Sequence, residues 1–279
     1  MIRVLVDSSA DYPLAELKSK NIEVVPLIVN VGNHVYQDEL ELERNRLYEY
    51  LLEGKSVITT SQPSPQAFRD IFEDVKEKGD EMICILLSSA LSGTFQSARL
   101  AKEMVDYDKI YLIDSLTATI AIRILVEKAI QMINEKSSAL EIVKTLEELK
   151  GRVKITAAID TLKYLYLGGR VSKTTAFVAD VVNVKPAVVV TKEGEVEVAG
   201  KYLGVGRAIK DLTKQMKNAE IDPDYPLYLI YSYGQENCDK LRKNLQAAGI
   251  ADQGIFQLGA TLGVHIGPGG FGIVYVEKA

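Results

Sequence analysis

Cysteine and histidine are scarce in this 279-residue chain, which contains two of each. Cys84 lies in an apolar run and Cys238 near the start of a helical pattern, so their spacing fits neither a disulfide framework nor a metal site. We expect both thiols to be buried and inert. Because His34 and His265 form no zinc-binding motif such as HExxH, a catalytic zinc is not expected and no cofactor is predicted.

The sequence also lacks any block of basic residues and any apolar run approaching about 18 residues. The net charge is -5, from 33 Lys and Arg against 38 Asp and Glu. A phosphate backbone would find no basic footprint here, so a nucleic-acid partner is not expected. The chain reaches Asp7 before a signal-peptide core could form, and no integral membrane segment is predicted. We therefore expect a cytoplasmic protein.

Short apolar runs alternate with segments of helical spacing, and this rhythm predicts an α/β fold. In the helix predicted after Pro65, Phe68 and Phe72 share one face, and Ser64 is placed to cap it. A longer helical segment, Leu116–Ile133, carries few charges and should be largely buried. The apolar runs that predict strands in the first half are Val4–Val6, Val24–Val29, Ile83–Leu87 and Ile110–Ile113.

A change of pattern near residue 150 predicts the domain organisation. The helix predicted over Ala139–Lys150 ends at Gly151, and a new apolar run follows. Beyond it, Lys192–Glu195 separates two apolar runs and predicts a hairpin. We expect two α/β domains, residues 1–150 with a largely parallel sheet and flanking helices, and residues 151–279 with a mixed sheet. The further helices and strands predicted in the second half are Val205–Met216, Gln235–Ala248, Leu227–Ile230, Gly254–Leu258 and Gly272–Val276.

Three segments rich in hydroxyl side chains are candidate sites. The most informative, Ser88–Thr94, directly follows a predicted strand and precedes a helical pattern. Because free amides and serine hydroxyls would meet at this strand end, we expect it to bind an anion. Thr59–Pro65 presents hydroxyls on a backbone that two prolines stiffen. Asp7–Asp11 is either part of the site or a polar turn in which Ser9 or Asp11 caps the next helix.

Two segments of the second half contribute an imidazole and a charge. The glycine-rich segment Leu262–Gly270 holds His265, and it matches neither the P-loop nor the GxGxxG fingerprint. His265 either hydrogen-bonds an anion or has a purely structural role. In Tyr164–Ser172 two adjacent glycines predict the end of a helix, and another helix is expected after Ser172. Arg170 would then lie on a turn, either as a solvated charge or as a contact for a partner.

Taken in order, these segments resemble the motifs of the DegV family. Each piece is short, but their number and order are specific, and together they span the whole chain. The pieces that carry the resemblance are Asp7–Asp11, Thr60–Ser64, Leu87–Thr94, Asp114–Ser115, Leu167–Ser172 and His265–Gly269.

The resemblance implies a fatty-acid-binding protein with two α/β domains, which serves as the acyl-carrier subunit of a bacterial fatty acid kinase. Its ligand would be a long-chain fatty acid, and the chain alone would catalyse no reaction. The resemblance also implies that Arg170 meets the ATP-dependent kinase subunit. The residues that it assigns to the carboxylate, between the domains, are Thr60, Ser61, Ser92, Gly93, Thr94 and His265.

One stretch departs from the family pattern. Many members carry the sequence K-x-R-G-x-x-K-A, with its arginine near the head group, whereas this chain has Leu203 at that position. Either Lys201 or Arg207 substitutes for the arginine, or the carboxylate relies more on hydroxyls and His265.

Simple energetics agree with such a ligand. Each buried methylene contributes about 0.8 kcal/mol, so the tail can dominate affinity while hydroxyl hydrogen bonds fix orientation. Candidate walls for a tunnel are the segment Leu116–Ile133 and the helix face with Phe68, Ile71 and Phe72, although packing in the core is their simpler role.

Two other functions remain open from the residues. A serine hydrolase would use Ser92 with His265 and an aspartate such as Asp7 or Asp114, because geometry rather than spacing defines a triad. Against it, Ser92 lacks the GxSxG elbow, and a cluster of equivalent hydroxyls is unlike one activated nucleophile. A phosphotransferase acting alone would turn over ATP without a partner.

Overall fold

The computed structural model describes residues 1–172 and 183–279. The first half of the chain forms a parallel sheet of strand order β2-β1-β6-β7. Its strands are β1 (Ile2–Asp7), β2 (Ile22–Val25), β6 (Glu81–Leu86) and β7 (Ile110–Asp114). Its helices are η1 (Ser8–Ala10), α1 (Leu14–Ser19), α3 (Pro65–Lys78), α4 (Thr94–Val105), α5 (Ile120–Asn134) and α6 (Ala139–Lys150).

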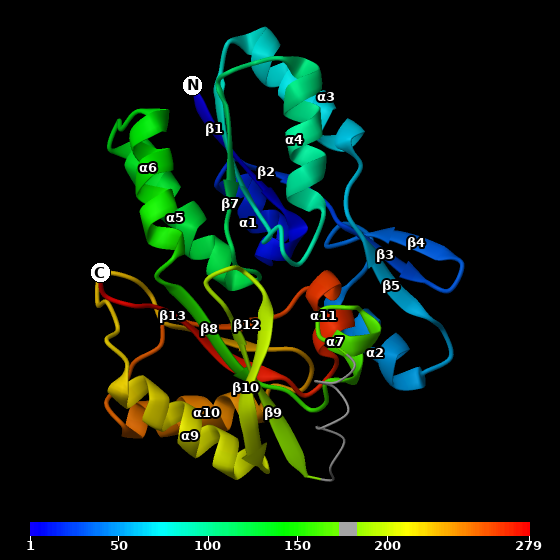
Figure 1. The fold of residues 1–279 in the computed structure, drawn as a ribbon, viewed down its shortest axis with the longest axis vertical. Helices are drawn as coiled ribbons and strands as arrows, with labels where there is room; N and C mark the ends of the chain where they lie inside the picture. Colours follow the sequence, from blue (N-terminus) through cyan, green and yellow to red (C-terminus); the bar gives the residue numbers. More distant parts are fainter. Residues whose placement is uncertain (173–182) are drawn as a thin grey trace.

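Both faces of this sheet are buried, because alternate residues of the central strands pack against different helices. Leu5 and Met82 cluster with residues of α3 and α4, whereas Val4 and Ile83 cluster with α5 and α6. Figure 1 shows the two helix pairs on opposite sides of the strands. Strands buried on both faces are apolar throughout, which is why they read as continuous runs. The predicted parallel sheet with flanking helices is confirmed.

A small antiparallel sheet of order β4-β3-β5 projects from this half as an arm (Figure 1). The prediction of one strand over Val24–Val29 is wrong, because β2 ends at Val25 and the next strand belongs to the arm. Pro26 separates the two and has no N–H for a sheet ladder. The elements of the arm are β3 (Ile28–Val31), β4 (His34–Gln37), α2 (Arg44–Glu53) and β5 (Ile58–Ser61).

The second half contains a mixed sheet of order β10-β9-β8-β13-β11-β12, in which only β11 and β12 pair in parallel among the described strands. Helices α9 and α10 cover one face, and the other face packs toward α5. The predicted mixed sheet and hairpin are confirmed. The elements are β8 (Val153–Ala158), α7 (Lys163–Leu167), β9 (Val184–Val190), β10 (Val196–Leu203), α9 (Val205–Asn218), β11 (Tyr228–Tyr231), α10 (Glu236–Ala247), β12 (Ile255–Gln257), α11 (Ala260–Ile266) and β13 (Phe271–Val276).

Local predictions about helix ends had mixed outcomes. Ser64 caps α3 as predicted, since its hydroxyl accepts the N–H of Ala67. The helix predicted from Leu116 begins only at Ile120, because Leu116 and Thr119 have positive φ angles of 51° and 57°. The helix expected after Ser172 falls outside the described residues. The boundary at residue 150 falls between α6 and β8 and stays a prediction.

The turn Asp7–Asp11 does not cap α1. That helix begins after Pro13 without a side-chain cap, whereas Asp7 accepts the N–H of Ser9 and caps the short helix η1. Both cysteines are buried, as predicted. Among the described helices, none combines the length and the apolar character that crossing a membrane requires.

Candidate functional site

A cavity of about 400 Å³ lies where the strand ends of the first sheet meet one face of the second sheet. The arm and α11 complete its wall. The lining is mainly apolar, with a few polar groups, which is the usual composition of a small-molecule site. Its apolar residues include Leu27, Leu87, Ile155, Val188, Val190 and Ile230.

Five of the six predicted head-group residues line this cavity. Thr60 and Ser61 come from the end of β5, Ser92 and Gly93 from the loop before α4, and His265 from α11. The sixth, Thr94, is fully buried and does not line it. Its hydroxyl lies 2.8 Å from that of Ser92, so Thr94 orients the Ser92 side chain without facing the cavity itself.

His265 is held by a residue of the arm. Its Nε2 lies 2.8 Å from the Thr60 hydroxyl, and its Nδ1 has no hydrogen-bond partner among the described residues. Burial, and then the nearby positive charge of Arg170, lower the pKa of His265 to about 4. The imidazole is therefore neutral at neutral pH. Gly168 makes room for the ring, since a Cβ there would overlap Nδ1.

Two buried aspartates fix the backbone around the site. Asp7 accepts the N–H of Leu87 at 2.7 Å and so anchors the end of β6. Asp11 accepts the N–H of Gly259, 2.9 Å away, at the start of the helix that carries His265. Burial raises the pKa of Asp7 to about 6 and that of Asp11 to about 7. The Asp7–Asp11 turn therefore positions the site, and neither carboxylate lines the cavity.

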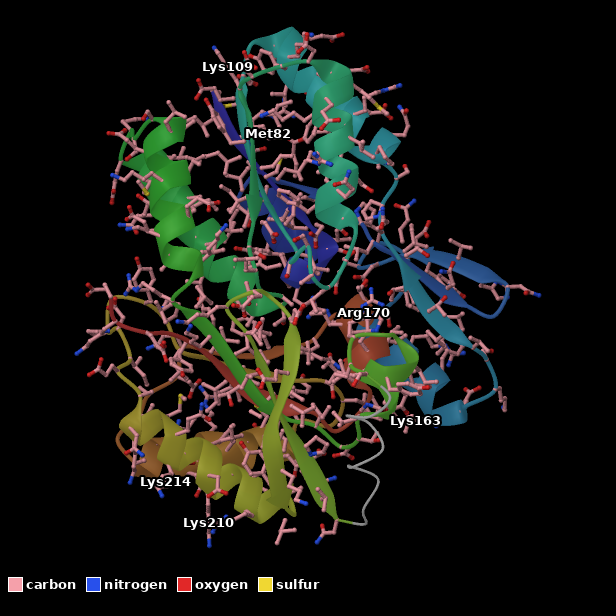
Figure 2. The ribbon with its side chains drawn as sticks, in the orientation of Figure 1. Met82, Lys109, Lys163, Arg170, Lys210 and Lys214 are labelled. Carbon is pink, nitrogen blue, oxygen red and sulfur yellow. The ribbon has the colours of Figure 1, made fainter. Side chains whose placement is uncertain are left out.

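Arg170 lies at the junction of the two halves (Figure 2) and lines the cavity. It is half-buried, not a fully solvated charge on a turn. Its Nε and Nη2 donate to the carbonyl oxygen of Leu91 at 3.0 and 2.8 Å, and Nη1 donates to that of Gly168. Burial lowers its pKa, and no carboxylate of residues 1–172 or 183–279 forms an ion pair with it. A positive charge at the cavity thus lacks a counter-ion within the described part of the chain.

The candidate tunnel walls mostly have the simpler role that we gave them, which is packing in the core. Phe68 and Phe72 pack against α4 in a separate core cluster, and from Leu116–Ile133 only Ala118 and Thr119 line the cavity. The walls come instead from β8 and the β9–β10 hairpin, which sequence reasoning missed. The run of valines in β9 could have indicated this wall. A strand with one solvated face alternates apolar and polar residues, and this run does not.

The stretch that departs from the family pattern lies outside the cavity lining. Leu203 is 75% exposed near the end of β10. Lys201 is also exposed, and Arg207 pairs with Asp211 at 2.7 Å. Neither cation substitutes at the cavity in this structure, whereas Arg170 supplies a guanidinium there.

The structure does not bring a hydrolase triad together. The Ser92 hydroxyl contacts Thr94, and the Nε2 of His265 contacts Thr60. The oxygens of Asp114 accept hydrogen bonds from Ser89 and from the N–H of Leu116. Among the described residues there is also no group of three His, Cys, Asp or Glu side chains arranged to hold a metal ion.

Comparisons with known proteins agree on one family. The family model described as "Uncharacterised protein, DegV family" matches residues 1–278. A DegV domain-containing protein of Caldanaerobacter subterraneus is 36% identical over 99% of both chains. Among solved structures, a DegV family protein of Thermus thermophilus has a TM-score of 0.89 and 28% identity over 99% of both chains. That protein is described as binding a fatty acid. DegV of Bacillus subtilis, described as a fatty acid binding protein, has a TM-score of 0.84 and 30% identity over 99% of both chains. The chain therefore belongs to the DegV family.

Proposed function

We propose that this protein binds a long-chain fatty acid in the central cavity and presents its carboxylate to a separate, ATP-dependent kinase subunit for phosphorylation to an acyl phosphate. The observation that carries the proposal is the asymmetry of the cavity. Its walls are mainly apolar, yet hydroxyls, a neutral imidazole and the guanidinium of Arg170, which lacks a counter-ion among the described residues, also face it. A ligand with one anionic end and an apolar body matches this arrangement.

The two parts of such a ligand would contribute differently. Each methylene moved from water into the cavity contributes about 0.8 kcal/mol, so a long tail supplies most of the affinity. Hydrogen bonds to a charged group contribute about 1.5 to 3 kcal/mol each, and they fix which end of the acid faces Arg170. The fatty acid binding named for the Thermus thermophilus and Bacillus subtilis relatives supports the same ligand here.

We propose that the carboxylate lies among Thr60, Ser61, Ser92, Gly93 and His265, with Thr94 orienting the Ser92 hydroxyl. His265 is neutral and acts as a hydrogen-bonding group, so Arg170 provides the positive charge. The Nδ1 of His265 has hydrogen-bonding capacity that no described residue uses.

Presentation to a kinase subunit is the finer part of the proposal. A groove of about 650 Å³ lies beside the cavity and shares Arg170 with it. A partner seated on this groove would contact Arg170, which lines both the groove and the cavity. This supports Arg170 as the residue that meets the kinase subunit while it also faces the carboxylate.

Calorimetric titration with palmitic acid and with its methyl ester tests the proposed ligand. The two have the same tail, but the ester has no charge. We expect the acid to bind at least about tenfold more tightly, because only the acid can pair with Arg170. Equal affinity for both would contradict recognition of the carboxylate, and binding of neither would contradict the function itself.

A further inference from the structure

The β9–β10 hairpin forms one wall of the cavity. Val188 and Val190 of β9 and Val196 of β10 line it, and Val190 pairs with Val196 next to the turn. β10 is an edge strand, so the hairpin has a neighbouring strand on one side only. Figure 1 shows the turn of this hairpin reaching the first half of the molecule near the beginning of α5.

A single side chain of the first half holds the tip of this hairpin. The hydroxyl of Ser88, which is fully buried, donates to the carbonyl oxygen of Gly194 at 2.8 Å. The other hydrogen bonds of the turn stay within it. The N–H groups of residues 193–195 donate to Thr191, and the N–H of Thr191 donates to the carbonyl oxygen of Glu195. Across the described residues, the Ser88 hydroxyl makes the one hydrogen bond between this turn and the first half.

Gly194 fits this contact closely. Its φ is +80°, a left-handed conformation that favours glycine. A Cβ at this position would overlap the Ser88 hydroxyl and lie 3.0 Å from the Cα of Leu116. The tip can therefore dock against Ser88 only because residue 194 has no side chain.

Next to the hairpin, the cavity borders the groove described above. The cavity and the groove share three lining residues, Leu91, Arg170 and Val196. Leu91 belongs to the same turn as Ser88, and its carbonyl oxygen accepts both hydrogen bonds from Arg170. If the hairpin tip lifted from Ser88, Val196 would move away from Leu91 and the cavity would join the groove.

We propose that Ser88 is a positioning residue that locks the hairpin over the cavity, and that release of this lock is the step that admits and releases the fatty acid. The identity of the ligand as a fatty acid depends on the proposed function, whereas the contact between Ser88 and the hairpin does not. Ser88 does not line the cavity, so it acts through the hairpin and not by touching the ligand.

This role has a kinetic signature. A lock that works in the same way on the empty and the loaded protein sets how often the cavity opens, so weakening it raises the association and dissociation rates together. The equilibrium affinity then changes little, because the two effects cancel. A residue that holds the head group would instead raise mainly the dissociation rate and weaken the affinity.

The test compares Ser88→Ala and Gly194→Ala with Ser89→Ala by stopped-flow fluorescence, using cis-parinaric acid as the fatty acid. Ser89 is the matched control, because it is an exposed neighbour whose hydroxyl donates to Asp114 and not to the hairpin. We expect both rates to rise at least fivefold in Ser88→Ala and Gly194→Ala, with Kd within about twofold, and no change in Ser89→Ala. Unchanged rates, or a weaker Kd with an unchanged association rate, would overturn the proposal.

Hydrogen exchange of the ligand-free proteins separates the lock from the ligand. Amides of residues 189–197 should exchange faster in Ser88→Ala than in the wild type and in Ser89→Ala, while those of β1 and β6 stay unchanged. Equal exchange in the hairpin would overturn the lock whatever the binding result. If the wild type binds no fatty acid, the proposed function fails, and with it the role of the lock in ligand exchange.

Discussion

The Nε2 of His265 lies 2.8 Å from the hydroxyl of Thr60, although the two residues are 205 positions apart in the chain. Thr60 comes from the arm and His265 from the helix that packs beside it, so the contact joins the two halves of the chain at the cavity. Because the imidazole is neutral, the pair carries two protons and uses one of them in the contact between its members, so it can offer one hydrogen bond to a carboxylate without a charge of its own.

Removing the Thr60 hydroxyl should weaken fatty acid binding. We expect Thr60→Val to raise Kd about tenfold. The substitution removes a hydroxyl proposed to face the head group, and the imidazole of His265 loses the contact at Nε2 that holds it in place. Thr59→Val is the matched control, because Thr59 is an exposed neighbour on the same strand and does not line the cavity. Equal effects of the two substitutions in calorimetric titrations would argue against a role for Thr60 in the site.

Binding should depend little on pH between about pH 6 and pH 8. The pKa of His265 is lowered from 6.5 to about 4, first by burial, so the ring stays neutral over this range. An imidazole that bound the carboxylate as a cation would lose affinity as the pH rose through its pKa. Asp11 ionises in this range, but it does not line the cavity and accepts the N–H of Gly259 in either protonation state. We therefore expect Kd to stay within about twofold, measured below the concentration at which the acid aggregates. A steady loss of affinity with rising pH that disappears in His265→Gln would contradict a neutral imidazole at this position.

The buried aspartates should make the fold less stable as the pH rises. Burial raises the pKa of Asp11 from 3.8 to about 7 and that of Asp7 to about 6, so the folded state holds protons that the unfolded state has lost. The free energy of unfolding therefore falls between about pH 4 and pH 7, by up to about 1.4 kcal/mol per pH unit for each carboxyl. His265 has the opposite effect. Its pKa is lowered from 6.5 to about 4 in the folded state, so it makes the free energy of unfolding rise with pH between these two values.

The variant Asp11→Asn isolates one of these contributions. Asparagine can still accept the N–H of Gly259 but cannot ionise, so urea unfolding should show a stability that falls less with pH than in the wild type. The contribution of His265 is the same in both proteins, so it cancels in the difference between their pH profiles. The control is Asp70→Asn, on the exposed side of α3. Parallel pH profiles for wild type and Asp11→Asn would show that Asp11 does not titrate in this range.

Arg170 offers a test of both parts of the proposed function. Without its charge, Arg170→Ala should bind palmitic acid about tenfold to a hundredfold more weakly and its methyl ester unchanged. At fatty acid concentrations that saturate the variant, acyl phosphate formation with the kinase subunit should still be impaired if Arg170 meets that partner. Full activity at saturation would contradict the docking role, and unchanged affinity for the acid would contradict the electrostatic one.

Leu203 should not influence the head group. Its side chain is exposed and lies outside the cavity lining, so Leu203→Arg is expected to leave Kd for palmitic acid within about twofold. A large gain in affinity would mean that the arginine of other family members reaches the carboxylate from this position.

The sequence was sufficient to predict the layout of the fold, but not the walls of the cavity. Continuous apolar strands and capped helices are local signals, which explains why the parallel sheet and the Ser64 cap were predicted correctly. Pro26 was overlooked as a strand break, and the positive φ angles of Leu116 and Thr119 depend on contacts that no local pattern reveals. Whether an apolar side chain faces a cavity or the core depends on tertiary packing, as Phe68 and Val188 illustrate.

The candidate head-group residues were predicted by motif and not by periodicity. Their hydroxyls follow β6 of the parallel sheet and lie at the end of β5 in the arm, two separate sheets that meet at the cavity. Three features needed coordinates. Thr94 is hidden behind Ser92, Arg170 folds back onto Leu91, and Ser88 binds the hairpin tip. Each depends on a contact between segments or on burial, which spacing along the chain does not encode.

Native mass spectrometry of the protein, purified without added lipid, tests the central claim most directly. A fatty acid that fills an apolar cavity should survive purification, so we expect an adduct of the mass of one long-chain fatty acid, which excess palmitic acid replaces. The same adduct should be depleted in Arg170→Ala. A wild-type protein that is uniformly free of adduct and takes up no palmitic acid on addition would contradict the account.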